Sequence, residues 1–311
     1  MVTRRMLVVI AAGAAGVAAT PFQALAGQGY YGGLDSFASP GSRRGRATVP
    51  VFLNDAGPFT FMVDTAANAS VIADDLATRL QLPSLGDIGM HTLIGREVVP
   101  AARVERMRSG TLDAPDVRVA VGSRPAMGGL DGLLGCDLLV GRKVILNFGS
   151  RQRVRIARSS APPRSFRSGV SPGIPLVVSG ERQFGNLLMI PAQINRTPVV
   201  AIIDSGAEGT ILNRAAARLG NAVPLTPRDG QDIRRIQSPT GEVTTAQAML
   251  LPSLRFAGFA LTDLPVAVGD FHSFRFWGLE DTPAILVGLD ILRMFKSVHI
   301  DLGRAELSLH V

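Results

Sequence analysis

The chain has 311 residues, of which 46% are hydrophobic and 18% are charged, so it can bury a sizeable core and is not a disordered chain. Its 34 glycines and 20 prolines are typical of a turn-rich β protein and argue against a helical bundle. The formal net charge of +7 comes almost entirely from scattered arginines, without a basic helix or a ribonucleoprotein motif. We therefore expect a solvated basic surface and no nucleic-acid partner.

Residues 1–26 are predicted to be a signal peptide. Arg4 and Arg5 precede an apolar run, and Ala24-Leu25-Ala26 forms a small-x-small cleavage pattern. The first residues resemble a twin-arginine signal, which predicts export to the periplasm or the extracellular space. Residues 27–45 are predicted to be an N-terminal tether. No later segment reaches the ~20 apolar residues that span a bilayer, so we expect no stable membrane insertion after cleavage.

Cysteine and histidine usage argues against a metal or cofactor site. Cys136 is the single cysteine, so it cannot form an intrachain disulfide, and we interpret it as a small buried hydrophobic residue. The four histidines lack the spacing of metal ligands. We therefore expect neither a metal nor a cofactor.

The decisive feature of the sequence is an internal repeat. Residues 46–157 and 173–311 carry matching motifs in the same order, and residues 158–172 form a Ser/Pro/Arg-rich linker between them. In each half a proline lies six residues before an aspartate, Asp64 or Asp204, at the end of an apolar run. The repeat predicts two similar lobes, each with one aspartate.

The segments around the two aspartates predict the same local structure. Residues 51–64 and 192–204 are each predicted to form a β-hairpin, because their centres are rich in residues that tolerate tight turns. Each aspartate then ends the second strand of its hairpin. Short helical patterns follow and end at Leu80 and Leu219. Each aspartate is thus expected at a corner between a strand and a loop.

A second motif is repeated further along each half. Residues 132–139 and 284–292 both read as an apolar strand, a glycine, an acid and a short helix. The acids are Asp137 and Asp290, which we expect to cap the helix or to hydrogen-bond the aspartate-bearing loop. A closing strand follows in each half.

These motifs resemble the retropepsin fold, within the superfamily of pepsin-like aspartic proteases. Residues 202–207, Ile-Ile-Asp-Ser-Gly-Ala, match the family motif fully, whereas residues 62–67 carry Ala66 where the family has glycine. The resemblance implies an all-β fold with short helices. It also implies two tandem lobes related by a pseudo-two-fold axis, with a cleft between them. We expect a monomer that contains this internal pseudo-dimer.

The resemblance also implies the chemistry of the site. Asp64 and Asp204 would hold a water molecule that attacks a peptide bond, because two close carboxyl groups can share one proton and act as acid and base. Thr65 and Ser205 would hydrogen-bond across to the opposite loop, and Gly206 would present its N–H group. The predicted activity is that of an aspartic endopeptidase acting on peptides or proteins. The alternative is a weak or inactive peptide-binding relative, because of Ala66.

Such a peptidase needs a flap over its cleft. Two turns between β-like runs are candidates, one containing Gly95 and the other Gly241. Ordinary surface hairpins are the alternative for both. The aromatic segment 271–277 is expected to pack in the core or in a partly buried loop, with the lining of a substrate pocket as the alternative.

Overall fold

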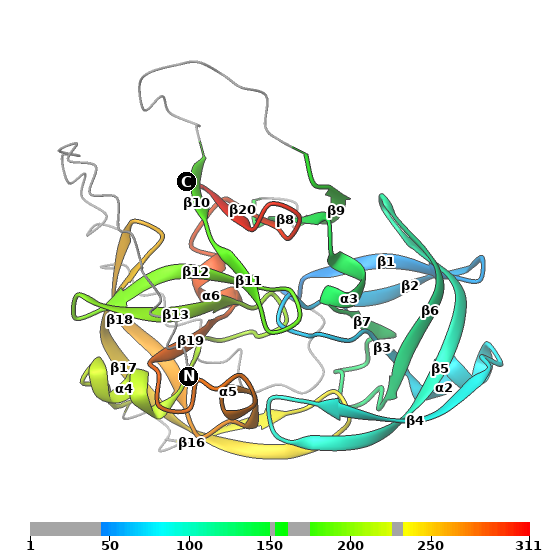
Figure 1. Cartoon of the computed structure of the whole chain (residues 1–311), viewed down its shortest axis with the longest axis horizontal. Coiled ribbons are helices and arrows are strands. Elements are labelled where there is room, and N and C mark those ends of the chain that lie inside the picture. Colours follow the sequence, from blue (N-terminus) through cyan, green and yellow to red (C-terminus); the bar gives the residue numbers. More distant parts are fainter. Residues whose placement is uncertain (1–44, 150–152, 161–174, 226–232) are drawn as a thin grey trace, which may run out of the picture. The chain divides into compact units, whose positions relative to one another are not determined.

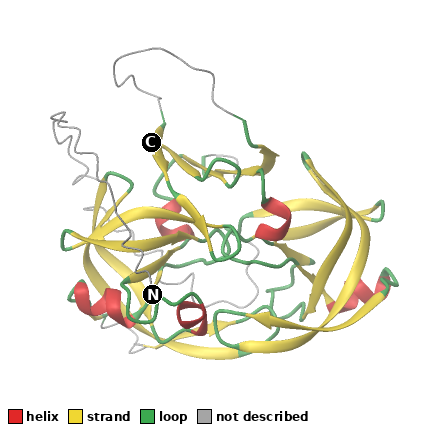
Figure 2. Cartoon of the chain, in the orientation of Figure 1, coloured by secondary structure: helices red, strands yellow, loops and turns green. Residues whose placement is uncertain are grey.

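The computed structural model describes residues 45–149, 153–160, 175–225 and 233–311, which form mainly β-strands with short helices between them (Figures 1 and 2). The all-β prediction is confirmed. The predicted signal peptide lies outside the described residues, as do most of the tether and most of the linker. In the described part of the chain, no helix has the length and apolar character needed to cross a bilayer.

The first half forms a seven-stranded sheet in the order β1-β2-β7-β3-β6-β5-β4, and an additional pairing of β1 with β5 curls the sheet onto itself. Its strands are β1 (Thr48–Leu53), β2 (Ala56–Val63), β3 (Val71–Ala73), β4 (Ser84–His91), β5 (Arg96–Ser109), β6 (Leu112–Gly122) and β7 (Gly132–Leu134). The helices α2 (Asp74–Arg79) and α3 (Cys136–Leu139) follow β3 and β7.

The second half repeats this order. Its sheet runs β11-β12-β13-β19-β14-β18-β17-β15, with β16 paired to β17 and a closing pairing of β12 with β17. The strands are β11 (Glu181–Gln183), β12 (Leu187–Ile194), β13 (Thr197–Ile203), β14 (Ile211–Leu212), β15 (Val223–Pro224), β16 (Ile233–Gln237), β17 (Val243–Phe256), β18 (Phe259–Val268) and β19 (Ala284–Val287). The helices are α4 (Arg214–Leu219), α5 (His272–Phe276) and α6 (Leu289–Leu292). Thus β12-β13-β19-β14-β18-β17 matches β1-β2-β7-β3-β6-β5.

The two predicted hairpins are present with the same turn geometry. Asn54 and Asp55 join β1 to β2 with φ of 47° and 66°, and Asn195 and Arg196 join β12 to β13 with φ of 48° and 66°. Two consecutive left-handed residues match the natural twist of paired strands, and asparagine tolerates this conformation. The hairpins therefore aim both aspartates from equivalent strand ends.

A third sheet contains strands from both halves, which the sequence did not predict. Its order is β10-β21-β20-β8-β9, formed by β10 (Leu176–Ser179), β21 (Glu306–His310), β20 (Ser297–Asp301), β8 (Arg142–Asn147) and β9 (Arg153–Arg158). The closing strands β8 and β20 pair directly, and Lys143 Nζ lies 3.2 Å from the Asp301 carboxylate across that pairing. This sheet therefore joins the two halves of the chain into one hydrogen-bonded unit.

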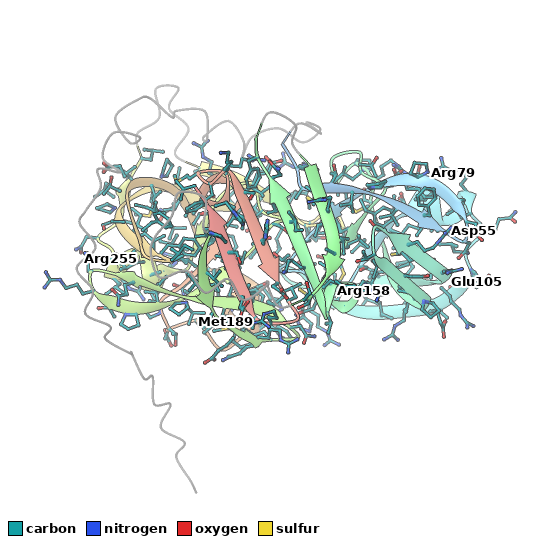
Figure 3. The ribbon with its side chains drawn as sticks, turned by 90° about the horizontal axis from the view of Figure 1, so that it is seen from above. Asp55, Arg79, Glu105, Arg158, Met189 and Arg255 are labelled. Atoms are coloured by element: carbon teal, nitrogen blue, oxygen red, sulfur yellow. The ribbon has the colours of Figure 1, made fainter. Side chains whose placement is uncertain are left out.

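The core lies beneath these sheets, and charge lies outside them. Val144 and Leu146 of β8 and Val298 and Ile300 of β20 are fully buried on one face of the shared sheet. In Figure 3 the side chains of Asp55, Arg79, Glu105 and Arg255 point away from the ribbon, and all four are exposed. The alternation of apolar and polar positions along the strands accounts for this division.

Candidate active site

Asp64 and Asp204 each follow the inner strand of a hairpin, and the neighbouring parallel strand fixes each backbone. The N–H group of Asp64 donates to the carbonyl oxygen of Leu134 at 2.9 Å, and that of Asp204 donates to Val287 at 3.0 Å. Leu134 and Val287 end β7 and β19, the strands of the repeated apolar motif. The two motifs found in the sequence are therefore adjacent in each half.

The residues after the aspartates hydrogen-bond across the two halves. The N–H group of Thr65 donates to Ser205 Oγ at 3.2 Å, and that of Ser205 donates to Thr65 Oγ1 at 3.0 Å. Each hydroxyl also donates to the strand opposite, Thr65 to Ile203 O at 2.8 Å and Ser205 to Val63 O at 2.7 Å. Both side chains are fully buried. These are the cross-loop bonds that the resemblance implies, and they hold the two loops face to face.

Each aspartate is also fixed within its own loop. Asp64 Oδ1 accepts from the N–H groups of Ala66 and Ala67, both at 3.0 Å. Asp204 Oδ1 accepts from Gly206 at 2.8 Å and Ala207 at 2.9 Å. In both carboxyl groups one oxygen is thus held by backbone donors, which orients the side chain.

The Asp64 carboxyl group packs against the opposite loop at Gly206. A Cβ atom added to Gly206 would lie 2.4 Å from Asp64 Cγ and within 2.7 Å of both carboxyl oxygens. The absence of a side chain at residue 206 is therefore what lets the Asp64 carboxyl reach the loop that carries Asp204. The pseudo-symmetric position in the first half is Ala66. Neither residue has a positive φ, so the alanine brings a methyl group but no left-handed backbone strain.

Burial and mutual repulsion shift the protonation of the pair. Burial, followed by the negative charge of Asp64, raises the pKa of Asp204 to about 8. Burial also raises the pKa of Asp64, against the hydrogen bonds from Ala66 and Ala67 that lower it. Two neighbouring buried carboxyl groups do not readily ionise together, so the pair retains one proton near neutral pH. One group can then act as an acid and the other as a base.

The family model described as aspartyl protease matches residues 49–138 and 190–291, one region in each half. The chain belongs to the aspartyl protease family. Both matched regions contain an aspartate that the cross-loop bonds bring together, so the family assignment and the tandem geometry agree. A search of the curated proteins found no match.

Asp137 and Asp290 hold the loops of this aspartyl protease from behind. Asp137 accepts from the Ser70 N–H group at 3.1 Å and its hydroxyl at 2.8 Å, and Asp290 accepts from Thr210 N and Oγ1 at 2.9 and 2.8 Å. Gly135 and Gly288 occupy the cap positions of the following helices. Of the two predicted roles, the acids therefore fulfil the loop-binding one.

We expect Asp290→Asn to lower the free energy of unfolding by about 2 kcal/mol, because an amide cannot accept from both Thr210 donors in this geometry. Denaturant unfolding followed by circular dichroism measures the change. Asp137→Asn is the matched variant in the other half. A stability within about 0.5 kcal/mol of the wild type would contradict the loop-binding role.

The two flap candidates both contact the opposite half. Gly95 lies in the turn between β4 and β5, where the Thr92 carbonyl accepts from Ser273 Oγ of α5 at 3.0 Å. Gly241 lies in the turn between β16 and β17, where the Pro239 carbonyl accepts from the Ser123 N–H group at 3.2 Å. Hairpins that only lie on the surface of their own half would lack such contacts.

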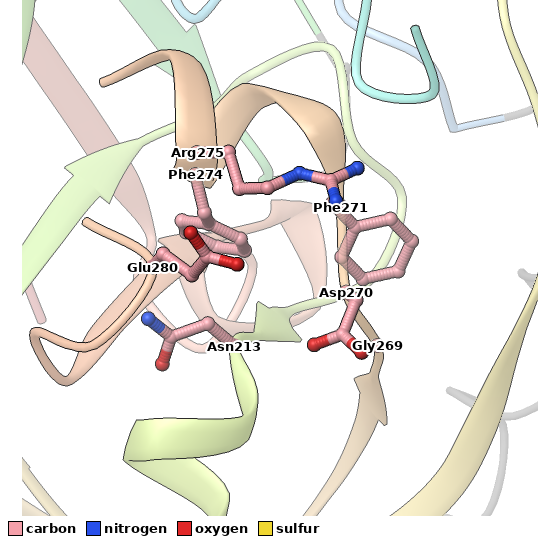
Figure 4. A pocket seen from close by; sticks show the side chains of 7 residues that line it. All are labelled: Asn213, Gly269, Asp270, Phe271, Phe274, Arg275 and Glu280. Atoms are coloured by element: carbon pink, nitrogen blue, oxygen red, sulfur yellow. The ribbon is translucent and has the colours of Figure 1, made fainter. Parts of the chain in front are cut away.

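The aromatic segment 271–277 forms α5 and its flanks. Phe271 and Phe274 are buried, as expected for core packing, whereas Phe276 is 53% exposed. A small hollow beside α5 is lined by residues of the second half and contains neither aspartate (Figure 4); its lining residues are Asn213, Gly269, Asp270, Phe271, Phe274, Arg275 and Glu280. The hollow is therefore separate from the paired aspartates.

Cys136 and Arg46 lie beside the loops that carry the aspartates. Burial raises the pKa of the Cys136 thiol, which donates to Thr65 O at 3.3 Å, so Cys136 is an unreactive packing residue beneath the loop. Arg46 was missed: its guanidinium lies 3.0 Å from Glu208, in the loop after Asp204, and also donates to Met127 O. The residues involved are 162 positions apart, so sequence spacing carries no signal of this contact. No cluster of three or more metal-ligating side chains occurs among the described residues.

Proposed function

We propose that the chain is an aspartic endopeptidase in which Asp64 and Asp204 activate one water molecule against a peptide bond. The observation that carries this proposal is the reciprocal bonding of Thr65 and Ser205, together with the packing of the Asp64 carboxyl on Gly206. This arrangement supports two carboxyl groups that share one proton and face one substrate position.

Asp64 and Asp204 carry out different proton transfers. Ionised Asp64 takes a proton from the water as its oxygen attacks the carbonyl carbon, while protonated Asp204 gives its proton to the carbonyl oxygen. We place the shared proton on Asp204, because burial and then the negative charge of Asp64 raise the pKa of Asp204 well above that of an ordinary carboxyl group. The proton taken up by Asp64 then passes to the leaving nitrogen as the carbon–nitrogen bond breaks. As the carbonyl re-forms, one hydroxyl group of the tetrahedral intermediate returns its proton to Asp204, so both carboxyl groups finish in their starting states.

The second candidate function is peptide binding with little or no turnover. Ala66 favours it, because its methyl group stands where the other loop has a glycine in contact with a carboxyl group. A displacement of the aspartates by a fraction of an ångström would reduce catalysis while leaving a peptide-binding cleft.

Turnover of a denatured protein and of a peptide library by the wild type and by Ala66→Gly separates the two functions. The peptidase proposal expects the wild type to cut internal bonds and to be inhibited by a pepstatin-type inhibitor. Cleavage by the glycine variant alone would favour the binding function. Inactivity of both, with both folded, would reject the peptidase proposal.

The pH dependence of cleavage provides a further test. We expect kcat/KM to fall as the pH rises through about 8, the raised pKa of Asp204, because the pair then loses its shared proton. The unfolded chain binds no proton at this carboxyl above its ordinary pKa, so the proton is a property of the folded site. Initial rates at constant ionic strength between pH 5 and 9.5, ~0.5 unit apart, measure the limb. A rate that stays level to the upper end would contradict the shared proton.

We also propose that the protein is exported and acts as a monomer. Cell fractionation of the wild type beside Arg4→Lys combined with Arg5→Lys tests the twin-arginine prediction, since the double variant should stay inside the cell. We expect a monomer, because the internal pseudo-dimer would complete the site within one chain. Light scattering tests this oligomeric state.

A further inference from the structure

The tip of the β4–β5 hairpin is tied to α5 through a pair of histidines. His91 Nδ1 lies 2.8 Å from His272 Nε2, and the His91 ring stacks on Phe276 with ring centroids 4.0 Å apart. Next to them, Ser273 Oγ donates to the Thr92 carbonyl at 3.0 Å. His91 is exposed and Ser273 is buried. The hairpin of the first half is thus fastened to the second half by one buried and two accessible contacts.

A hydrogen bond between two imidazoles depends on protonation. One ring donates an N–H group and the other accepts with a bare nitrogen, so the bond forms when at most one ring is charged. When both rings are protonated, two N–H groups face each other and the positive charges repel. The contact between His91 and His272 is therefore lost when the pair takes up its second proton.

The charged groups around the pair favour this loss in acid. Arg275 on α5 adds positive charge beside His272, and Arg96 on β5 is the register partner of His91. Glu97 is an acidic group of the same hairpin, and it accepts from Thr92 Oγ1 at 3.1 Å. Burial, followed by the charges of His91 and Arg275, lowers the pKa of His272. The fastened state thus binds its protons less tightly than the released state.

The β16–β17 hairpin, which contains the other flap candidate, provides a contrast within the same molecule. Its tip touches the first half through the Pro239 carbonyl and the Ser123 N–H group, two backbone groups that do not titrate. Hydroxyl groups organise its turn, where Ser238 Oγ lies 2.6 Å from Thr240 Oγ1. The two hairpins are therefore alike in topology but differ in their response to protons.

We propose that the His91–His272 pair is a proton-operated latch, which holds the β4–β5 hairpin on α5 near neutral pH and releases it in mild acid. The proposal rests on the proposed function in one respect, the assignment of this hairpin as a flap that an extended peptide must pass. The pKa of His272 is lowered in the latched state, so the latch is stable at pH values above the ordinary pKa of histidine. That stability is lost as the pH falls. Acid therefore opens the flap.

Amide hydrogen exchange read by mass spectrometry tests the latch on the full chain. After correction for intrinsic exchange rates, we expect peptides covering 88–98 to lose protection by roughly fivefold or more between pH 7.5 and pH 5. Peptides covering 237–243, in the other hairpin, serve as the internal reference and should change by less than about twofold.

Two variants distinguish the latch from general loosening. His272→Gln removes the titrating ring and should make the protection of 88–98 independent of pH. Phe276→Ala weakens the contact at both pH values but should preserve the pH ratio. An equal pH ratio in both hairpins of the wild type would overturn the proposal, as would a ratio that persists in His272→Gln.

The same measurement on Asp204→Asn separates the latch from the proposed peptidase activity. This variant cannot share a proton between the aspartates, yet its hairpin should show the wild-type pH response. A response that disappears in Asp204→Asn would assign the effect to the aspartates and overturn the latch. A response that persists in a folded wild-type protein that does not cleave peptides would uphold the latch and reject the peptidase.

Discussion

Asp204→Asn is expected to reduce peptide cleavage by at least about a thousandfold in a folded protein. The amide neither donates an acidic proton to the carbonyl oxygen nor titrates in the accessible pH range. Its oxygen still accepts from the Gly206 and Ala207 N–H groups, so the loop keeps its shape. The loss therefore reports chemistry and not folding.

Asp64→Asn is the matched variant on the opposite loop. We expect a loss of similar size, because one water molecule needs both carboxyl groups and the double variant should be hardly worse than either single one. Initial rates on a cleaved peptide, with a pepstatin-type inhibitor to count competent sites, measure both losses. Full activity in either single variant would reject the shared site.

Asp204→Asn should also make the protein more stable near neutral pH. The pKa of Asp204 is raised in the folded state, so above the ordinary carboxyl pKa of the unfolded chain the charged form opposes folding. We expect Asp204→Asn to raise the free energy of unfolding at pH 7 by on the order of 2 kcal/mol, and by little at pH 3.5. Equal stability changes at both pH values would argue against the buried carboxyl as the cause.

The sequence predicted what depends on local pattern and repetition. The hairpins that aim Asp64 and Asp204 follow from turn residues such as Asn54 and Asn195, whose left-handed backbone is a local property. The loop-binding role of Asp290 is one of two alternatives that the repeated motif offers, and the contact with Thr210 decides between them. Repetition placed both halves of the site because each motif occurs twice in the same order.

The sequence could not predict contacts between positions that no periodicity relates. The pairing of β8 with β20 joins closing strands that were recognised separately, but strand periodicity does not name a partner. The contact of His91 with His272 spans 181 residues, and neither histidine stands in a motif. Likewise the effect of Ala66 depends on packing between the two loops: the backbone at residue 66 has no positive φ, and the close packing at Gly206 makes the effect one of space.

The packing of the Asp64 carboxyl group on Gly206 predicts that Gly206→Ala will reduce kcat/KM by at least about a hundredfold. A methyl group at residue 206 must displace that carboxyl group by a large part of an ångström. The added Cβ would lie 2.4 Å from Asp64 Cγ, far inside van der Waals contact. The loop is pinned by the buried bonds of Thr65 and Ser205, so the Asp64 side chain has to move instead. Crowding should also lower the free energy of unfolding by about 1 to 3 kcal/mol.

The exchange variant, Gly206→Ala combined with Ala66→Gly, is the control for this effect, because it keeps one methyl group and one glycine but swaps them between the loops. We expect it to recover part of the activity lost in Gly206→Ala, since the aspartates can shift together toward the loop that has become less crowded. Steady-state kinetics and thermal unfolding of the four proteins complete a double-mutant cycle. If the two substitutions act independently in that cycle, the two methyl groups do not act on the aspartates through one shared space.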